Sequence, residues 1–269
     1  MLVSVIIPVY RQEKTIKKDI EAIYSVMSQT RWDFEIIVVI DGSPDNSLGE
    51  AKKFKRANVS VFGYKTNKGK GYAVKYGMAR SKGSLIAFID SGMDINPNSI
   101  SMLLEHQEWY GSDIVVASKR HSASRVNLTF LRRIYSAGYY YGVKLLFGLK
   151  VRDTQVGLKV FKRNVLDKVL PRLLVKQFAF DIELLAVANH LGFTKIHEAP
   201  VELELNFSKV SKWNKWLPFF LDPGIRNILL DTLAVFYRMH ILRYYDDNNK
   251  RLWKYDKELE MRVNTGEMG

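Results

Sequence analysis

The sequence has no cysteine in its 269 residues. Disulfide bonds and metal sites built from thiolates are therefore excluded. The absence also permits a cytoplasmic setting, in which disulfides are rare. Because 47% of the residues are hydrophobic and 26% are charged, we expect a chain that folds around a packed core.

The chain also lacks a recognisable secretion signal and a long uninterrupted apolar run. Its apolar start, Leu2–Val9, has no basic segment before it and is too short to cross a bilayer, so we interpret it as a buried strand. The most apolar later stretch, 216–245, is interrupted by Asp222, Arg226, Asp231 and Arg238. A spanning helix needs roughly 18 or more residues with few charges, and none is predicted.

Acidic residues are too few to balance the basic ones. The chain has 41 lysines and arginines against 28 aspartates and glutamates, a net charge of +13. This surplus suggests an anionic partner such as nucleic acid, a lipid surface or a phosphorylated substrate, although solubility alone is an alternative reason. The basic residues are dispersed and match no nucleic-acid-binding signature, so no nucleic-acid partner is expected.

Short apolar runs alternate with helical patterns in the first half of the chain. The expected strands are 2–9, 34–40, 59–64, 84–89 and 113–117, and the expected helices are 14–27, 46–54, 72–81 and 97–109. This alternation predicts an α/β fold whose mostly parallel sheet is covered by helices on both faces.

Beyond about residue 120 the pattern is less regular. It predicts a helix at 128–149, a strand at 158–161, a helix at 179–191 and one or two strands within 195–205. The final residues, beyond Asp246, are charged, and we expect them to be frayed.

Polar residues follow two of the predicted strands. Asp41-Gly42-Ser43 and Asp90-Ser91-Gly92 stand at strand carboxyl ends, where ligands bind in folds of this kind. Asp41 could accept hydrogen bonds from a base or ribose, and Asp90 with Asp94 could bind Mg²⁺ or Mn²⁺, because hard cations prefer oxygen ligands. The alternatives are an ordinary turn at Asp41 and a helix cap before Pro97.

A glycine-rich segment, Asn67–Gly71, precedes one of the predicted helices. Glycines let a backbone approach a ligand closely, and a helix N-terminus favours anions, so Lys68 and Lys70 could face phosphate. The segment lacks the spacing of a Walker A motif, and an ordinary turn is the alternative.

Several segments together carry a family resemblance. Val3–Tyr10, Val38–Ser43, Asn67–Gly71 and Phe88–Asp90 resemble glycosyltransferase family 2 in order and spacing. In the second half, Arg152–Phe161 and Phe178–Leu185 resemble dolichyl-phosphate β-glucosyltransferases and, less closely, dolichyl-phosphate mannose synthases. The resemblance spans residues 2–207.

The resemblance implies a Rossmann-like GT-A fold, a nucleotide-sugar donor, Mg²⁺ or Mn²⁺, and a polyprenyl-phosphate acceptor. UDP-glucose is the favoured donor, with GDP-mannose and other UDP-sugars left open. The residues implied at the donor are Pro8, Tyr10, Glu13, Asp41, Lys70 and Asp90. Asp181 and Glu183 lie where related enzymes place catalytic carboxylates, with structural capping as the alternative. Asp153 and Gln155 are implied to shape the sugar pocket.

The sequence departs from the family pattern at two motifs. The family's Asp-x-Asp is here Asp90-Ser91-Gly92, so the metal is expected at Asp90 and Asp94, or metal dependence is weakened. The family's Tyr-Asn-Glu is here Tyr10-Arg11-Gln12, and Glu13 is the candidate substitute for the missing carboxylate.

An enzyme that uses a phosphate acceptor needs cationic side chains to bind the acceptor and does not need a strong general base. It is anionic at neutral pH and can attack the anomeric carbon directly, with inversion, so catalysis would rest on positioning and charge. Arg120, Arg132 and Arg133 are the candidate phosphate ligands, because guanidinium binds phosphate in a bidentate fork. A solvated helix face is the alternative for Arg132 and Arg133.

Two apolar segments near basic residues, 128–149 and 213–245, are candidates for contact with lipid. Packing on the core or on a second copy of the chain is the alternative. We therefore expect a catalytic domain at 1–207, amphipathic helices at 208–246 and a charged tail at 247–269, with the protein peripheral on the cytoplasmic face of a membrane.

Three rival interpretations stay open. One is a member of the same family that makes a polysaccharide. Another is a basic nucleic-acid-binding protein. The third is a scaffold that has lost its chemistry, which the missing aspartate at position 92 favours.

Overall fold

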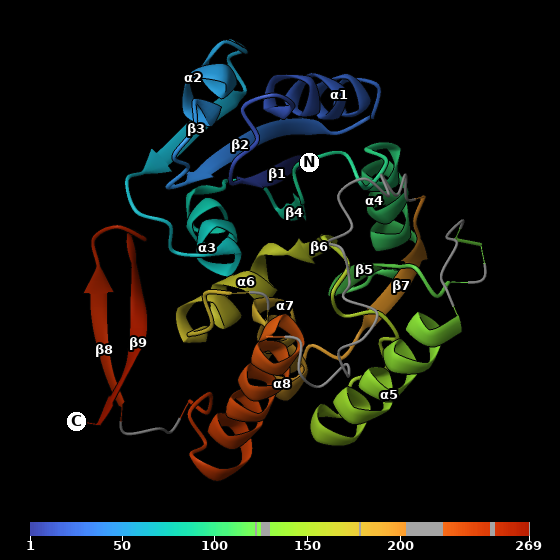
Figure 1. Ribbon diagram of the computed structural model, residues 1–269, viewed down its shortest axis with the longest axis vertical. Coiled ribbons are helices and arrows are strands. Elements are labelled where there is room, and N and C mark those ends of the chain that lie inside the picture. The colour runs from blue at the N-terminus through green and yellow to red at the C-terminus, as the bar shows by residue number, and fades with distance from the viewer. Residues whose placement is uncertain (122, 125–129, 178, 203–222, 248–250, 269) are drawn as a thin grey trace.

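The computed structural model (Figure 1) describes the chain except residues 122, 125–129, 178, 203–222, 248–250 and 269. Its centre is a seven-stranded sheet in the order β3-β2-β1-β4-β6-β5-β7. The strands are β1 Leu2–Val9, β2 Asp33–Asp41, β3 Val59–Tyr64, β4 Leu85–Ile89, β5 Ile114–Ser118, β6 Leu158–Lys162 and β7 Ile196–Pro200. Within this sheet β6 runs antiparallel to β4 and β5, and the other pairs are parallel, which confirms the predicted mostly parallel sheet.

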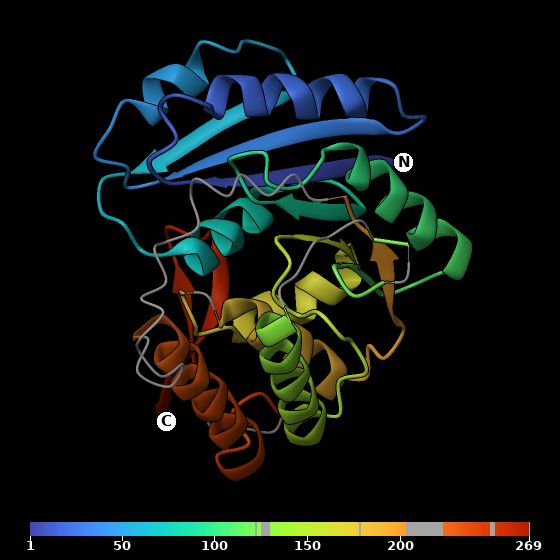
Figure 2. The same ribbon diagram turned by 45° about the vertical axis from the view of Figure 1, so that its right-hand side comes forward.

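Helices cover both faces of the sheet (Figures 1 and 2). They are α1 Ile16–Ser28, α2 Ser47–Lys52, α3 Lys70–Arg80, α4 Asn98–Tyr110, α5 Phe130–Phe147, α6 Arg163–Val169, α7 Phe180–His190 and α8 Pro223–Phe236. Successive side chains of a strand point to opposite faces. In β1, Ile6 therefore packs in the core shared with α3 and α7, while Val5 and Ile7 pack in the core shared with α1 and α4.

The C-terminal part of the chain continues on the side of α3 and α7. From α8 the chain passes into a π-helical turn, η4 Tyr237–Ile241, and then into a hairpin of β8 Arg251–Asp256 and β9 Met261–Met268. Within the described part of the chain, no helix combines the length and the apolar character needed to cross a membrane. The expected boundary between residues 207 and 208 lies outside the described residues.

The expectation of a frayed tail is wrong. An isolated two-stranded hairpin is marginal in water, so it needs a surface to pack on. This hairpin packs on the rest of the protein. The Tyr244 hydroxyl donates a 3.0 Å hydrogen bond to the Asn264 carbonyl, and the Arg172 guanidinium lies 5.2 Å from the centre of the Trp253 ring. The sequence did not indicate these two strands, because charged residues interrupt the apolar pattern of both.

Candidate active site

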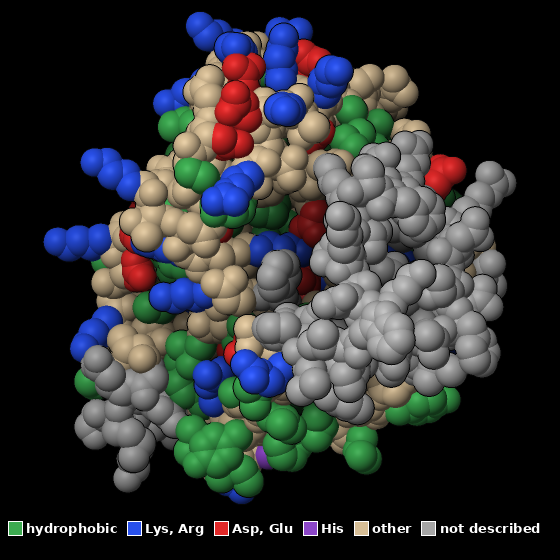
Figure 3. All heavy atoms as spheres, in the orientation of Figure 1, with side chains coloured by type: hydrophobic (Ala, Val, Ile, Leu, Met, Phe, Trp, Pro, Cys, Tyr) green, Lys and Arg blue, Asp and Glu red, His purple; other side chains and the backbone are tan. Residues whose placement is uncertain are grey.

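Four loops meet at the edge of the sheet where β1, β2, β3 and β4 end, because these strands run parallel. The loop after β3 is the glycine-rich segment that leads into α3. Figure 3 shows basic and acidic side chains together in a recess near the centre of the molecular face. The residues singled out in the sequence at positions 8–13, 41, 67–71 and 90–94 all lie on these loops, at strand ends or, for Lys70 and Gly71, in the first turn of α3.

Asp41 shapes the glycine-rich segment. Its carboxylate is almost fully buried and accepts hydrogen bonds from the backbone N–H of Lys68 at 2.7 Å and of Gly69 at 3.0 Å, and from the Asn67 side chain at 2.9 Å. Gly69 has φ +97°, which a residue with a side chain rarely adopts. The structure therefore gives Asp41 a defined role in holding the loop, and the expectation that it also contacts a nucleoside stays a prediction.

The loop after β1 is fastened to the loop after β2. Glu13 accepts a 3.0 Å hydrogen bond from the Asn46 backbone, and its own N–H donates to Asp45 at 3.1 Å. Pro8 is buried within β1, whereas the Tyr10 ring is 41% exposed with the Arg11 guanidinium 5.2 Å from its centre. An exposed aromatic ring on a fixed loop is a suitable surface for a planar ligand group.

Four charged side chains form the centre of the site. The Lys70 ammonium lies 2.8 Å from Asp90 and 3.6 Å from Asp181, and the fully buried Lys159 lies 2.5 Å from the other oxygen of Asp181. Burial lowers the pKa of Lys70, but the carboxylates of Asp181 and Asp90 outweigh it and raise the pKa above its usual value. Burial lowers the pKa of Lys159. Lys70 therefore stays cationic beside the half-exposed Asp90.

The loop that carries Asp90 and Asp94 has an unusual backbone. Gly92 and Met93 both have positive φ, at +102° and +58°, and the Gly92 N–H donates a 2.8 Å hydrogen bond to the buried Asp19 of α1. Asp94 is exposed on the same loop. Among the described residues there is no cluster of three or more potential metal-binding side chains. Two carboxylates on one loop still fit a hard cation that takes its other ligands from substrate phosphate and water.

Glu183 is separated from this charge cluster. It lies two residues after Asp181 on α7, and side chains at that spacing do not share a helix face. Its buried carboxylate accepts hydrogen bonds from the Val175 N–H at 2.8 Å, the Leu174 N–H at 3.0 Å and the Tyr245 hydroxyl at 2.6 Å. Burial raises its pKa. These contacts favour a role for Glu183 in holding the segment before α7, rather than the catalytic role inferred from the sequence.

The remaining predicted residues are only partly placed. Asp153 accepts a 3.2 Å hydrogen bond from the Lys119 backbone, and the Arg120 N–H donates to Ser118 at 3.3 Å. The Gln155 amide nitrogen is buried, and the Gln155 side chain lies beside the Tyr139 hydroxyl. Arg132 and Arg133 lie on α5, but their side chains are outside the described residues, so their predicted contact with phosphate is untested.

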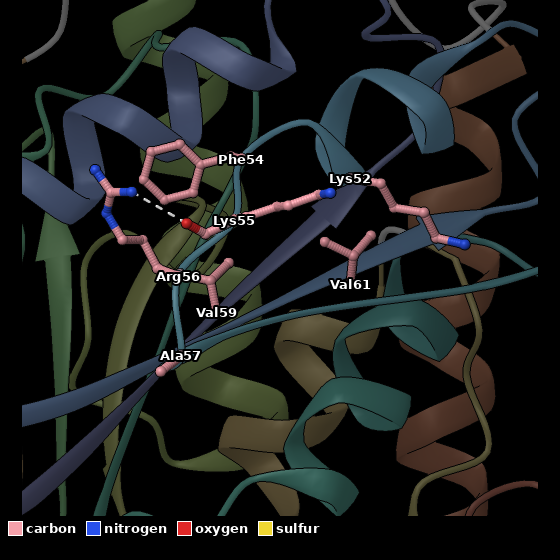
Figure 4. Close-up of a pocket in the computed structure, with 7 residues that line it drawn as sticks. All are labelled: Lys52, Phe54, Lys55, Arg56, Ala57, Val59 and Val61. Carbon is pink, nitrogen blue, oxygen red and sulfur yellow. Dashed lines mark hydrogen bonds between the residues drawn. The ribbon is translucent and has the colours of Figure 1, made fainter.

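A second hollow, of about 470 Å³, lies where α2 leads into β3 (Figure 4). Basic and apolar side chains line it: Lys52, Phe54, Lys55, Arg56, Ala57, Val59 and Val61. It stands at the start of β3, whereas the charge cluster lies beyond the ends of the parallel strands. It is therefore separate from the candidate active site.

Two residues of the site were missed in the sequence. Lys159 could have been predicted, because a lysine within a mostly apolar strand is expected to be buried only when an acidic partner is present. Asp19 carried none, since an acidic residue near the start of a helix is common at the surface.

Comparison with known proteins gives consistent matches. Residues 4–170 match the sequence model of the family described as glycosyl transferase family 2. A dolichyl-phosphate beta-glucosyltransferase of Drosophila melanogaster is 30% identical over 235 residues, which are 81% of this chain and 72% of the relative. One from Trichomonas vaginalis is 28% identical over 257 residues, 89% of this chain and 75% of the relative.

A solved structure shares the fold. It is the glucosyl-3-phosphoglycerate synthase of Mycobacterium tuberculosis in complex with Mn²⁺, UDP-glucose and phosphoglyceric acid. The alignment has a TM-score of 0.63 at 18% identity and covers 98% of this chain and 86% of the other. At that identity the similarity establishes the architecture alone.

Proposed function

The chain belongs to glycosyl transferase family 2, with the GT-A fold, and from that premise we propose that it transfers glucose from UDP-glucose to a polyprenyl phosphate such as dolichyl phosphate. The observation that carries the proposal is the cluster of Asp90, Lys70 and Asp181 next to the glycine-rich loop. The names of the Drosophila and Trichomonas relatives support the donor sugar and the acceptor.

The donor is expected beyond the carboxyl ends of β1, β2 and β4. Tyr10 and the loop fastened by Glu13 would form one wall for the nucleoside, with Pro8 and Asp41 behind them. Lys70 would face the diphosphate, because two carboxylates hold its ammonium in place and the side chain stays partly exposed. Asp153 and Gln155 would contact the sugar, Gln155 through the side-chain amide that lies beside the Tyr139 hydroxyl.

A divalent cation, Mg²⁺ or Mn²⁺, would be held by Asp90 and Asp94. When bound, such a cation stabilises negative charge on a leaving diphosphate. Lys70 would place a second positive charge near the diphosphate, which would offset weaker binding of the cation by a loop that lacks an aspartate at position 92. The Mn²⁺ in the solved complex of the synthase supports a divalent cation here.

The acceptor phosphate would attack the anomeric carbon from the face opposite the diphosphate. The C–O bond to the acceptor forms as the bond to UDP breaks, which inverts the anomeric centre. No strong general base is needed, because the phosphate is already anionic. Arg120, Arg132 and Arg133 would hold the acceptor, and Asp181 would keep Lys70 in position. Glu183 is assigned to the loop that it fastens.

An apolar stripe supports contact with a membrane surface. Leu230, Leu233, Tyr237 and Ile241 are each more than half exposed, and their spacing places them on one face of α8 and η4. Leu145, on α5, is 86% exposed. Figure 3 shows hydrophobic side chains along the lower edge of the molecule. A lipid acceptor gives such a stripe a function, since its polyprenyl chain stays in the bilayer.

The test measures transfer of radiolabelled sugar to a short polyprenyl phosphate. UDP-glucose and GDP-mannose are compared, with Mg²⁺, with Mn²⁺ and with EDTA. Asp90→Asn is the active-site variant, and Asp33→Asn is the matched control, because Asp33 is 87% exposed at the opposite edge of the sheet. We expect metal-stimulated transfer from UDP-glucose, reduced at least a hundredfold in Asp90→Asn and unchanged in Asp33→Asn.

Other outcomes separate the alternatives. Transfer from GDP-mannose in place of UDP-glucose would reassign the donor within the family. UDP binding without transfer to any polyprenyl phosphate would favour a polysaccharide acceptor. A chain that binds no nucleotide sugar would contradict the proposal and favour the scaffold.

A further inference from the structure

The tip of the C-terminal hairpin reaches the glycine-rich loop. The Glu258 carboxylate lies 2.5 Å from the ammonium of Lys68, although the two residues are 190 positions apart. Figures 1 and 2 both show the hairpin beside α3. Lys68 belongs to the loop whose backbone N–H groups are held by Asp41. A segment that follows the family-matched region, 4–170, therefore contacts the loop expected to bind the donor.

The Lys68 side of this ion pair contacts two aromatic rings. The Lys68 ammonium lies 4.6 Å from the centre of the Tyr72 ring and 5.2 Å from that of Tyr64. Burial raises the pKa of Glu258, but its hydrogen bonds with Lys68 and Tyr72 outweigh this and keep the pKa below its usual value. Glu258 therefore carries its negative charge at neutral pH, and the two tyrosine rings contact the Lys68 ammonium that it binds.

The tip itself is firmly built. The Asp256 carboxylate accepts hydrogen bonds from the N–H of Glu258 at 2.8 Å and of Leu259 at 3.0 Å. The Arg80 guanidinium donates to the Glu258 carbonyl at 2.6 Å and pairs with Glu260 at 3.1 Å. Leu259 is 3% exposed. The hairpin thus contacts α3 near both of its ends, at Lys68 and at Arg80.

A continuous set of contacts joins this tip to Asp41. Tyr64, on β3, is the register neighbour of Asp41 on β2. Burial and the neighbouring Asp41 carboxylate raise the pKa of the Tyr64 hydroxyl. Lys68 is thus held on both sides: its backbone N–H binds Asp41, and its side chain lies between Glu258 and the two tyrosine rings. Moving the side chain would disturb the backbone that Asp41 orders.

We propose that Glu258 is a positioning residue for the donor: by holding Lys68, it keeps the backbone of residues 67–69 in the shape that binds the nucleotide sugar. The inference rests on the proposed function only for the identity of the donor. The proposal gives the C-terminal hairpin an indirect role in nucleotide binding. The hairpin lies outside residues 4–170, which match the family. The hairpin acts through Lys68 and does not itself touch the reacting atoms.

Two measurements test this proposal. The first is calorimetric binding of UDP and UDP-glucose, together with KM and kcat for transfer, for Glu258→Gln, Lys68→Met and the double variant. Glu260→Gln is the matched control, because Glu260 lies on the same tip and pairs with Arg80 instead. The second is hydrogen exchange at the amides of Lys68 and Gly69 without donor.

We expect Glu258→Gln to weaken UDP binding and raise the donor KM roughly three- to tenfold, with kcat within about twofold, since a partly exposed ion pair contributes modestly. Lys68→Met should have the same effect, and the double variant should add nothing further. Exchange at the two amides should accelerate in Glu258→Gln and stay unchanged in Glu260→Gln. The charge reversal Glu258→Lys with Lys68→Glu should recover part of the binding.

The proposal is overturned if Glu258→Gln binds UDP and exchanges its amides as the unmodified protein does, or if Glu260→Gln has the same effect. A protein that binds UDP but transfers nothing to polyprenyl phosphate contradicts the proposed acceptor and leaves the binding test of Glu258 intact. A protein that binds no UDP contradicts both.

Discussion

Gly157 leaves the space that the Asp90 carboxylate occupies. A Cβ atom on residue 157 would lie 1.9 Å from Oδ2 of Asp90, far inside any allowed contact. The backbones are joined as well, because the Asp90 N–H donates a 2.8 Å hydrogen bond to the Gly157 carbonyl. The end of β4 and the turn before β6 therefore set the position of Asp90 together.

Gly157→Ala should displace Asp90 from the charge cluster. We expect kcat for transfer to fall at least tenfold, because displacement of a reacting group by about 1 Å has effects of that size or larger. Steady-state kinetics with UDP-glucose measure it. Gly142→Ala, where a Cβ would meet nothing within 4 Å, is the control and should retain activity. Equal kinetics for both variants would contradict the role given to this contact.

Asp181→Asn should destabilise the fold as well as reduce activity. It leaves the fully buried Lys159 with the Val156 carbonyl as its remaining described hydrogen-bond partner. Removing one member of a buried ion pair destabilises by roughly 3–5 kcal/mol. Urea denaturation should report that loss, and adding Lys159→Met should recover most of it without restoring transfer. A single variant as stable as the unmodified protein would argue against the ion pair.

Stability should rise with pH through the titration of Lys75. Burial lowers the pKa of Lys75 to about 8 from its ordinary value of 10.5. Between these values the unfolded chain binds more protons than the folded one, so the free energy of unfolding increases with pH, by up to roughly 1.4 kcal/mol per pH unit. Lys75→Met lacks this group. The free energy of unfolding of both proteins is measured by denaturation at pH 7.5 and 10. Between these values the unmodified protein should gain stability relative to Lys75→Met. A difference that stays constant would contradict the role given to Lys75.

Charged residues on the apolar stripe of α8 and η4 should weaken the proposed binding to lipid. Leu233→Glu with Ile241→Glu places two carboxylates on the face of α8 and η4, where each apolar side chain would otherwise contribute roughly 1.5–3 kcal/mol on burial. Flotation with vesicles containing about one third anionic lipid should show at least a tenfold loss. Leu48→Glu, on α2, is the control, since Leu48 is also exposed. Unchanged flotation in the double variant would exclude this stripe as the contact.

The strand pattern predicted most of the sheet. Near-continuous apolar runs at 2–9 and 34–40 became β1 and β2, because strands buried on both faces need apolar residues at most positions. The antiparallel direction of β6 was beyond the sequence, since the composition of a five-residue strand does not indicate in which direction the strand pairs with its neighbours.

The sequence by itself determined that the segments after Asp41 and Asp90 would meet, since parallel strands end at one edge of a sheet. It also indicated that the glycine-rich segment with Lys70 follows the third predicted strand. Only the tertiary structure decided which charges pair. Asp181 binds Lys159 and Lys70, Glu183 points to another neighbour, and Glu258 returns to Lys68. Local periodicity records which face of an element is buried, whereas an ion pair between distant residues depends on how complete elements pack, and no short pattern encodes that.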